Sequence, residues 1–302
     1  MKMNSFIKAS WLFAAAFFVT SGATAQKTVK PKPASKPVVF AVLDGGKQVE
    51  PIAAIDGGKL VDLGVADGAS AIFGTTYYKP KSSYPIIFGG APDGALTITK
   101  SNIGTECGGA TANATSRPVK AKLNGLVMAL ATSGPRKAST TFRRAPAPSE
   151  KAEIEILVRQ EFKKNGAGDA AVKTLRFHNF TALDFDGDGT PEFVGSYWIA
   201  PTASERRRLF FIAEGAPGGS IALTHSEHDV IKPEDVMTND LKDLDGGRGS
   251  ELLLDVLDAD GDGVKEVFTI GQAFEGNNYY VYKRAAGKWT KVFEAYRYRC
   301  AF

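Results

Sequence analysis

The chain has 302 residues, 43% of them hydrophobic and 23% charged, with a formal net charge of +4. These values are typical of a folded globular protein long enough for two modest domains, and they exclude a wholly disordered chain. The 32 Gly and 15 Pro favour many short strands joined by turns over long helices. No heptad or Gly-x-y period indicates a coiled coil or a collagen.

Residues 1–25 have the pattern of a secretory signal peptide. Lys2 and Lys8 precede an apolar stretch over 9–19, and Ala23-Thr24-Ala25 gives a small-x-small cleavage site before Gln26. The apolar stretch has about 11 residues, whereas a bilayer-spanning helix needs roughly 20. We therefore expect a cleaved, secreted or periplasmic chain with no membrane span in its mature part.

A Lys/Pro-rich linker over 26–37 leads into a predicted all-β domain over 38–133. Asp44-Gly45-Gly46-Lys47 recurs as Asp56-Gly57-Gly58-Lys59, and both predict hairpin turns, because they lack the Gly and Ser/Thr spacing of a phosphate-binding loop. No catalytic constellation is present in this domain. Its predicted strands are the short β-prone runs 38–43, 60–63, 71–78, 85–88, 95–99 and 126–131.

One helix is predicted after a second linker over 134–148. Ser149 is a suitable N-cap, Glu150 lies in the first turn, and Asn165-Gly166 ends the segment. The apolar residues of this segment repeat at helical spacing and predict one buried face; they are Ile154, Leu157, Val158 and Phe162.

The remainder of the domain over 149–302 predicts two sets of four strands. The first set covers 175–183, 192–199, 209–213 and 221–224, and the second covers 251–257, 265–270, 279–282 and 289–293. Each set has the size of an antiparallel meander, the unit of a propeller blade. The fold class is therefore mainly β, and because a closed propeller needs about 4 to 8 blades, we expect an incomplete propeller or a sandwich.

Two acidic loops stand at equivalent places in these sets, between the first and second predicted strands. The first loop covers 184–192 and the second covers 258–266. Both have carboxylates at positions 1, 3, 5 and 9 and Gly at positions 4 and 6, a spacing that can wrap 6 to 8 oxygens around a calcium ion. The position-7 carbonyls are further candidate ligands. The predicted ligands of two calcium ions are Asp184, Asp186, Asp188, Thr190 and Glu192, and Asp258, Asp260, Asp262, Val264 and Glu266.

The spacing begins like an EF-hand, but position 12 is Gly195 or Thr269 rather than Glu, and the flanking residues are strand-like. The two loops instead resemble the calcium loops of FG-GAP or VCBS-type repeats of the integrin-alpha-like family, Asp-x-Asp/Asn-x-Asp-Gly-x-x-Asp, with Glu192 and Glu266 in place of the last Asp. The resemblance covers about 175–200 and 250–275. It implies calcium-binding β-repeats and leaves the biological task open.

The chain has two cysteines, Cys107 and Cys300. An even number in an oxidising compartment favours a disulfide between them, although two free thiols are the alternative. Neither cysteine has a second Cys or a His at chelating spacing, so we do not expect them to bind a metal.

Positive and negative residues are unevenly distributed along the mature chain. Residues 26–148 hold 16 Lys and Arg against 7 Asp and Glu, whereas 149–302 hold 19 against 26. The basic charges are scattered, so we expect solvated tails and no nucleic-acid partner. His225 and His228 are spaced for a metal only on a helix, and the surrounding pattern indicates a strand.

These patterns predict a secreted or periplasmic calcium-binding β-repeat protein without enzymatic activity. Calcium would stabilise strand turns and a surface that binds a protein or a glycan, for which the aromatic run over 279–282 is one candidate. A secreted hydrolase or polysaccharide-processing accessory module with structural calcium is the second hypothesis. A purely structural envelope protein is the third.

Overall fold

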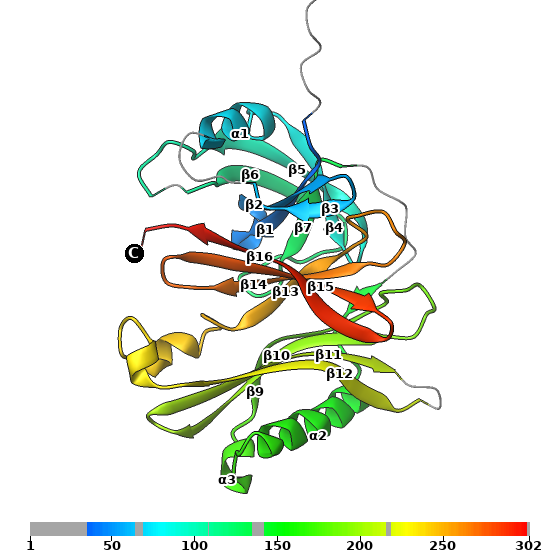
Figure 1. Cartoon of the computed structure of the whole chain (residues 1–302), viewed down its shortest axis with the longest axis vertical. Helices are drawn as coiled ribbons and strands as arrows, with labels where there is room; N and C mark the ends of the chain where they lie inside the picture. The colour runs from blue at the N-terminus through cyan, green and yellow to red at the C-terminus, as the bar shows by residue number, and fades with distance from the viewer. Residues whose placement is uncertain (1–34, 64–68, 108, 135–141, 216–218, 301–302) are drawn as a thin grey trace, which may run out of the picture. The chain divides into compact units, whose positions relative to one another are not determined.

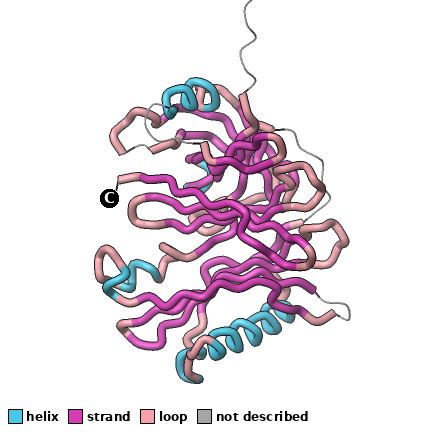
Figure 2. The backbone as a smooth tube through the Cα atoms, in the orientation of Figure 1, coloured by secondary structure: helices cyan, strands magenta, loops and turns pink. Residues whose placement is uncertain are grey.

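The computed structural model describes residues 35–63, 69–107, 109–134, 142–215 and 219–300. The predicted signal peptide and its cleavage site, with residues 26–34 of the predicted linker, lie outside these residues. Ser35–Phe302 form one unit, built from a β-barrel, two further antiparallel sheets and one long helix (Figures 1 and 2). The predicted mainly β class is confirmed.

A six-stranded barrel occupies the N-terminal part of the described chain. Its strands follow the order β1-β7-β4-β5-β6-β2, and pairing of β1 with β2 closes it, while β3 extends the sheet beyond β2. The two predicted Asp-Gly-Gly-Lys turns connect β1 to β2 and β2 to β3. The strands are β1 (Val38–Leu43), β2 (Gln48–Asp56), β3 (Lys59–Val61), β4 (Ser83–Phe88), β5 (Ala91–Ser101), β6 (Ala112–Pro118) and β7 (Ala129–Thr132).

One predicted barrel strand is wrong. The run 71–78 belongs mostly to the helix α1 (Ala69–Tyr77). Phe73 and Tyr77 are four residues apart, so a helix places both rings on one face, where each lies 6.3 Å from the ring of Phe40. Aromatic residues favour a strand only where neighbouring strands can pack against their side chains. Here the packing of Phe73 and Tyr77 on Phe40 overrides that preference.

Two barrel strands, β2 and β6, were not among the predictions. Pro51 and the buried Glu50 interrupt the apolar pattern of β2, and β6 consists mainly of small polar residues. Neither run shows the β-branched and aromatic enrichment on which the strand predictions rested.

The predicted helix is α2 (Pro148–Lys164), and a short helix α3 (Asp169–Val172) follows it. The N-cap is Ala147 rather than Ser149, because Pro148 takes the first helical position, which suits its fixed φ. The Glu150 carboxylate accepts the Ala147 backbone N–H at 2.6 Å, which satisfies a donor at the start of the helix. The predicted buried face is present, since Ile154, Val158 and Phe162 are fully buried.

Both predicted meanders are present as antiparallel sheets. The first sheet has the order β12-β11-β10-β9-β8, where β8 (Arg143–Arg144) lies inside the predicted second linker, and the second sheet has the order β13-β14-β15-β16. Two 3-10 helices, η2 (Pro233–Asp235) and η3 (Leu241–Leu244), lie between the sheets in sequence. The strands are β9 (Arg176–Leu183), β10 (Glu192–Thr202), β11 (Glu205–Gly215), β12 (Ile221–Ile231), β13 (Glu251–Leu257), β14 (Glu266–Gln272), β15 (Gly276–Ala285) and β16 (Lys288–Tyr298).

The second sheet is covered on both faces. One face shares a core with the barrel, in which Leu252, Phe268 and Tyr279 pack near Val39. Residues of its other face, among them Val267, share a core with the first sheet. Helix α2 covers the opposite face of the first sheet. Barrel, second sheet, first sheet and helix therefore form successive layers (Figure 1).

Candidate metal centre

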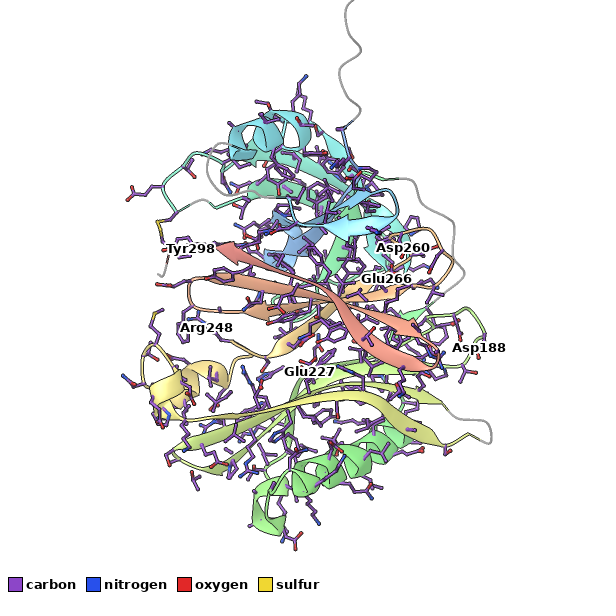
Figure 3. All side chains as sticks on the ribbon, viewed as in Figure 1. Asp188, Glu227, Arg248, Asp260, Glu266 and Tyr298 are labelled. Carbon is purple, nitrogen blue, oxygen red and sulfur yellow. A yellow bond between two sulfur atoms is a disulfide. The ribbon has the colours of Figure 1, made fainter. Side chains whose placement is uncertain are left out.

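The two acidic loops occupy the same position in the two sheets. The first loop joins β9 to β10 and the second joins β13 to β14, so each is the connection of the first hairpin of its sheet. Figure 3 shows Asp188 of the first loop on the same side of the molecule as Asp260 and Glu266 of the second. The Lys265 ammonium donates to the carbonyl oxygen of Phe185 at 2.8 Å, so the two loops are in direct contact.

The loops share one backbone conformation. In each, the carboxylate at position 1 accepts the N–H of position 4, position 3 accepts from position 5, position 5 from position 7, and position 9 from position 2. All four loop glycines have positive φ, a region that costs other residues energy; they are Gly187, Gly189, Gly261 and Gly263. Equal spacing in the sequence thus produces equal turns.

In the first loop, the structure brings together Asp184, Asp186 and Glu192. One carboxylate oxygen from each lies within 4.8 Å of the others, a separation at which all three could contact one ion. Asp184 and Glu192 are buried. Burial, and then the charges of Asp186, Asp184 and Asp188, raise the pKa of Glu192 to about 7. The cluster therefore carries a repulsion that a cation would remove.

Among the residues that the structure describes, no Lys or Arg forms an ion pair with a first-loop carboxylate. The nearby Lys265 gives its hydrogen bond to a backbone carbonyl instead. Burial lowers the pKa of Lys265, which the first-loop carboxylates oppose. Within the described ranges, the acidic groups of this loop therefore have no Lys or Arg counter-ion in contact with them.

Among the described residues, the second loop, unlike the first, has a lysine in contact with its carboxylates. The Lys283 ammonium on β15 lies 2.5 Å from an Asp260 oxygen, 2.7 Å from an Asp262 oxygen and 3.0 Å from a Glu266 oxygen. Partial burial opposes the charged form of Lys283, but these three contacts outweigh it and raise the pKa of the lysine. The hydrogen bond from Lys283 likewise lowers the pKa of Asp262.

The two loops bring different subsets of their predicted ligands together. In the second loop, Asp258, Asp260 and Asp262 each offer an oxygen within 4.8 Å of the others. Glu266 is outside that group, with one oxygen on Lys283 and the other on the Ala259 N–H. In the first loop Asp188 is outside the group, and it accepts the Thr190 N–H at 2.6 Å. The position-7 carbonyls of Thr190 and Val264 remain predicted ligands.

Sequence reasoning missed a third acidic cluster, which lies between the two sheets. The Tyr282 hydroxyl lies 3.1 Å from an oxygen of Glu227 on β12 and 3.1 Å from an oxygen of Glu251 on β13. The Thr269 hydroxyl donates to the other Glu251 oxygen at 2.5 Å. His225 and Lys291 lie 3.4 Å and 3.3 Å from Glu227, whose side chain is 39% exposed. Figure 3 labels Glu227.

The two contacts of the Tyr282 hydroxyl can both be hydrogen bonds only if one of the two carboxyls is protonated. Tyr282 has a single hydroxyl hydrogen and can donate to only one carboxylate, so the other contact is a hydrogen bond only if a carboxyl donates to the tyrosine oxygen. Burial raises the pKa of Glu251 to about 7. Hydrogen bonding to His225, followed by the charge of Lys291, lowers the pKa of Glu227 to about 2. Of the two carboxyls, Glu251 therefore holds a proton to the higher pH.

No local pattern pairs Glu227 with Glu251 in the sequence. Glu251 begins a predicted strand, and Glu227 lies in a strand that the prediction ended at residue 224. His225 and His228 lie on β12, as the strand interpretation of that segment requires, and not on a helix. Only the packing of the first sheet on the second brings the two carboxylates to one hydroxyl.

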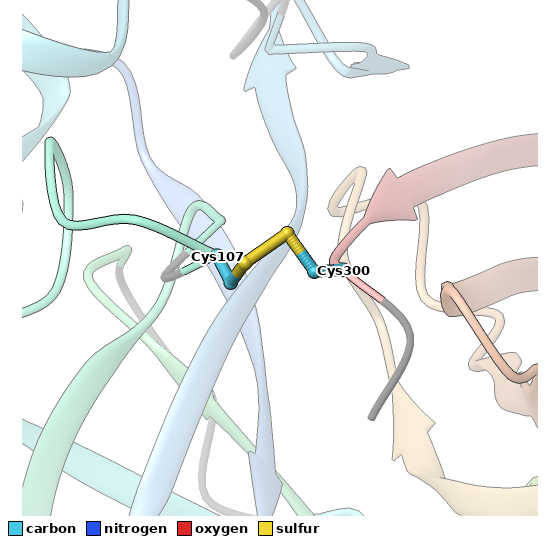
Figure 4. The surroundings of a disulfide bond; sticks show 2 residues. All are labelled: Cys107 and Cys300. Carbon is cyan, nitrogen blue, oxygen red and sulfur yellow. A yellow bond between two sulfur atoms is a disulfide. The ribbon is translucent and has the colours of Figure 1, made fainter.

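The predicted disulfide joins Cys107 to Cys300, whose Cα atoms are 5.0 Å apart (Figure 4). It links the loop before β6 of the barrel to the residues after β16 of the second sheet. A disulfide is typical of an oxidising, extracellular environment. In the described ranges, no helix has the length and apolar character needed to cross a membrane.

Comparison with known proteins identifies no relative of this chain. No family model, no curated protein and no solved structure matches the chain. Its functional interpretation therefore rests on the geometry above.

Proposed function

We propose that this is an extracytoplasmic calcium-binding β-repeat protein in which the first loop, of the FG-GAP type, binds a calcium ion. One observation carries the proposal: three carboxylates, two of them buried, converge, and no Lys or Arg among the described residues contacts them. Ligands that are all oxygen favour calcium over zinc, and magnesium prefers stricter octahedral geometry and retained waters.

The ion has a structural role in this proposal. It neutralises the mutual repulsion of Asp184, Asp186 and Glu192 and holds the β9–β10 turn in one conformation. A fixed turn keeps the neighbouring strand ends in place, where a protein or a glycan at the cell surface would bind. The disulfide supports an extracytoplasmic location, since such bonds persist in oxidising compartments.

Thermal unfolding with calcium, with magnesium and with a chelator tests the proposal. A ligand at 100 times its Kd stabilises the folded state by about 2.7 kcal/mol, which corresponds to a rise in Tm of several degrees. We expect a calcium-selective rise that Asp186→Asn removes. Glu234→Gln, a change at an exposed carboxylate away from both loops, is the control and keeps the rise. An equal rise in Asp186→Asn and in the unaltered chain would contradict the proposal.

The Glu227–Tyr282–Glu251 cluster favours a second candidate function, hydrolysis of a glycosidic bond. The pKa of Glu227 is lowered to about 2 and that of Glu251 is raised to about 7, and such a separation of two carboxyl pKa values is what a nucleophile and a general acid need in glycosidases. The two contacting oxygens are at most about 6 Å apart, because one hydroxyl lies 3.1 Å from each. That distance suits the roughly 5–5.5 Å of retaining enzymes better than the roughly 6.5–9.5 Å of inverting enzymes.

A panel of polysaccharides and aryl glycosides tests this second function. Glu227→Gln and Glu251→Gln should each abolish turnover if the pair is catalytic, whereas Asp186→Asn should reduce it only through stability. Absence of turnover on the whole panel would leave the calcium-stabilised binding protein as the proposed function.

A further inference from the structure

The register of the two sheets places Lys283 and Glu214 at corresponding positions. Val267 pairs with Tyr282 in the second sheet, so position 9 of the second loop, Glu266, stands opposite Lys283. Phe193 pairs with Ala213 in the first sheet, so position 9 of the first loop, Glu192, stands opposite Glu214. At one structural position, the second sheet therefore has a cation and the first has an anion.

The contacts of these two residues follow from their charges. The Lys283 ammonium enters the second loop and lies within 3.0 Å of oxygens from three of its four carboxylates. The Glu214 carboxylate contacts no first-loop carboxylate; it accepts from the indole N–H of Trp289 at 2.7 Å and pairs with Arg284 at 2.6 Å. The second loop thus already holds a positive charge, supplied by the chain, among its acidic groups.

A tethered ammonium and a divalent ion compete for the same oxygens. Calcium would need the carboxylates of Asp260, Asp262 and Glu266, each of which has an oxygen engaged by Lys283. If the lysine stayed close by, its charge would repel the ion; if it moved away, three charge-assisted contacts would be lost. Either alternative weakens calcium binding at the second loop, and no comparable cost applies at the first.

We propose that Lys283 is the resident cation of the second loop, so that the chain binds one divalent ion, at the first loop, and none at the second. The statement about the first loop rests on the proposed function, whereas the statement about the second loop does not. One hairpin then depends on calcium in the medium, while its counterpart is neutralised by the chain itself.

Calcium stoichiometry, measured by calorimetric titration and equilibrium dialysis on the purified chain, tests this inference. The unaltered chain should bind one ion, Asp186→Asn should bind none, and Asp260→Asn should still bind one. Lys283→Met removes the charge but keeps an apolar stem, and it should bind a second ion with a Kd on the order of 0.1–1 mM, the range of extracellular calcium modules. Lys283→Arg is the matched control, keeps the charge, and should bind one.

Two results would overturn the inference. One is binding of two ions by the unaltered chain, with one of them lost in Asp260→Asn; this result does not depend on how Lys283→Met folds. The other is a folded Lys283→Met, verified by circular dichroism and a cooperative melt, that gains no ion. An unaltered chain that binds no ion would instead contradict the proposed function, and a single ion gained by Lys283→Met would then still support the role of Lys283.

Discussion

The first and second sheets of this protein begin with the same hairpin and differ in how its acidic loop is neutralised. Four backbone hydrogen bonds and the glycine conformations match position by position, and the second loop adds a bond from the Gly263 N–H to Asp258. Lys283 contacts the second loop, while Glu214 stands at the corresponding position beside the first loop, where no described Lys or Arg contacts the carboxylates. A sequence motif can therefore specify a turn without specifying the charge beside it, because that charge comes from the neighbouring strand.

The sheets also differ in their attachment to the barrel, and the largest predicted effect tests this difference. Asp255 on β13 is fully buried and accepts the N–H groups of Gly89 and Gly90 as well as a hydrogen bond from Arg143 at 2.8 Å. Arg143→Met leaves this charge without its cation, and we expect a loss of about 3–5 kcal/mol in the free energy of unfolding. Urea denaturation measures it.

Thr181 is the counterpart of Asp255 in the first sheet and provides the comparison for Arg143→Met. It stands three residues before the first loop, as Asp255 stands three residues before the second. Thr181→Val removes a polar group at the position that corresponds to Asp255, and we expect the free energy of unfolding to change by less than about 1 kcal/mol. Equal losses in the two variants would show that the two sheets are anchored in the same way.

The disulfide is a second attachment of the second sheet to the barrel. It closes a separation of 193 residues. The double change Cys107→Ser/Cys300→Ser should lower the free energy of unfolding by about 2–5 kcal/mol, chiefly because the unfolded chain gains freedom. Thermal melts of the unaltered chain with and without a reductant check the result. A loss under about 1 kcal/mol would show that the salt bridge of the buried Glu50 with Arg299 already fixes the C-terminus.

The cluster between the sheets predicts a pH effect of smaller size. The pKa of Glu251 is raised to about 7 from an ordinary value of 4.5, so its stabilising contribution is complete below pH 4.5 and is lost as the pH rises toward 7. Glu251→Gln should therefore be more stable than the unaltered chain at pH 8, by on the order of 2 kcal/mol, with no advantage at pH 4.

Glu227 is the opposing control for that pH effect. Its pKa is lowered to about 2, so its contribution is present above pH 4.5 and is lost as the pH falls toward 2. Glu227→Gln should destabilise the protein at pH 7, opposite in sign to Glu251→Gln at pH 8. Denaturation curves across pH 3 to 9 compare the two, and the same sign in both variants would contradict the proton assignment.

The smallest predicted effect concerns the shared backbone of the two loops. Gly187 and Gly261 have φ of 83° and 82°, and an added Cβ would meet no atom within 4 Å at either position. Gly187→Ala and Gly261→Ala should therefore each cost about 1 kcal/mol, from backbone conformation alone. Gly246→Ala, where φ is not positive and space is also open, should cost almost nothing. Costs that differ widely between the two loop glycines would show that the loops are less alike than their hydrogen bonds indicate.

The sequence predicts the two sheets and their loops because the signals are local. A short, mostly apolar run between turn formers marks β13, whose predicted range 251–257 matches the observed one. Carboxylates on alternate positions with Gly at positions 4 and 6 mark the turns, and the hydrogen bonds that shape each loop span no more than seven residues. The even cysteine count likewise predicted the disulfide.

Tertiary structure alone decided the features on which the proposed functions depend. Helix α1 forms because Phe73 and Tyr77 pack on Phe40, more than 30 residues earlier in the chain. Lys283 neutralises a loop 17 residues before it, through a strand register that no local pattern reveals. Glu227 and Glu251 meet at Tyr282 only because two sheets pack face to face. Local backbone preference selects the turns, whereas long-range packing decides which charges lie beside them.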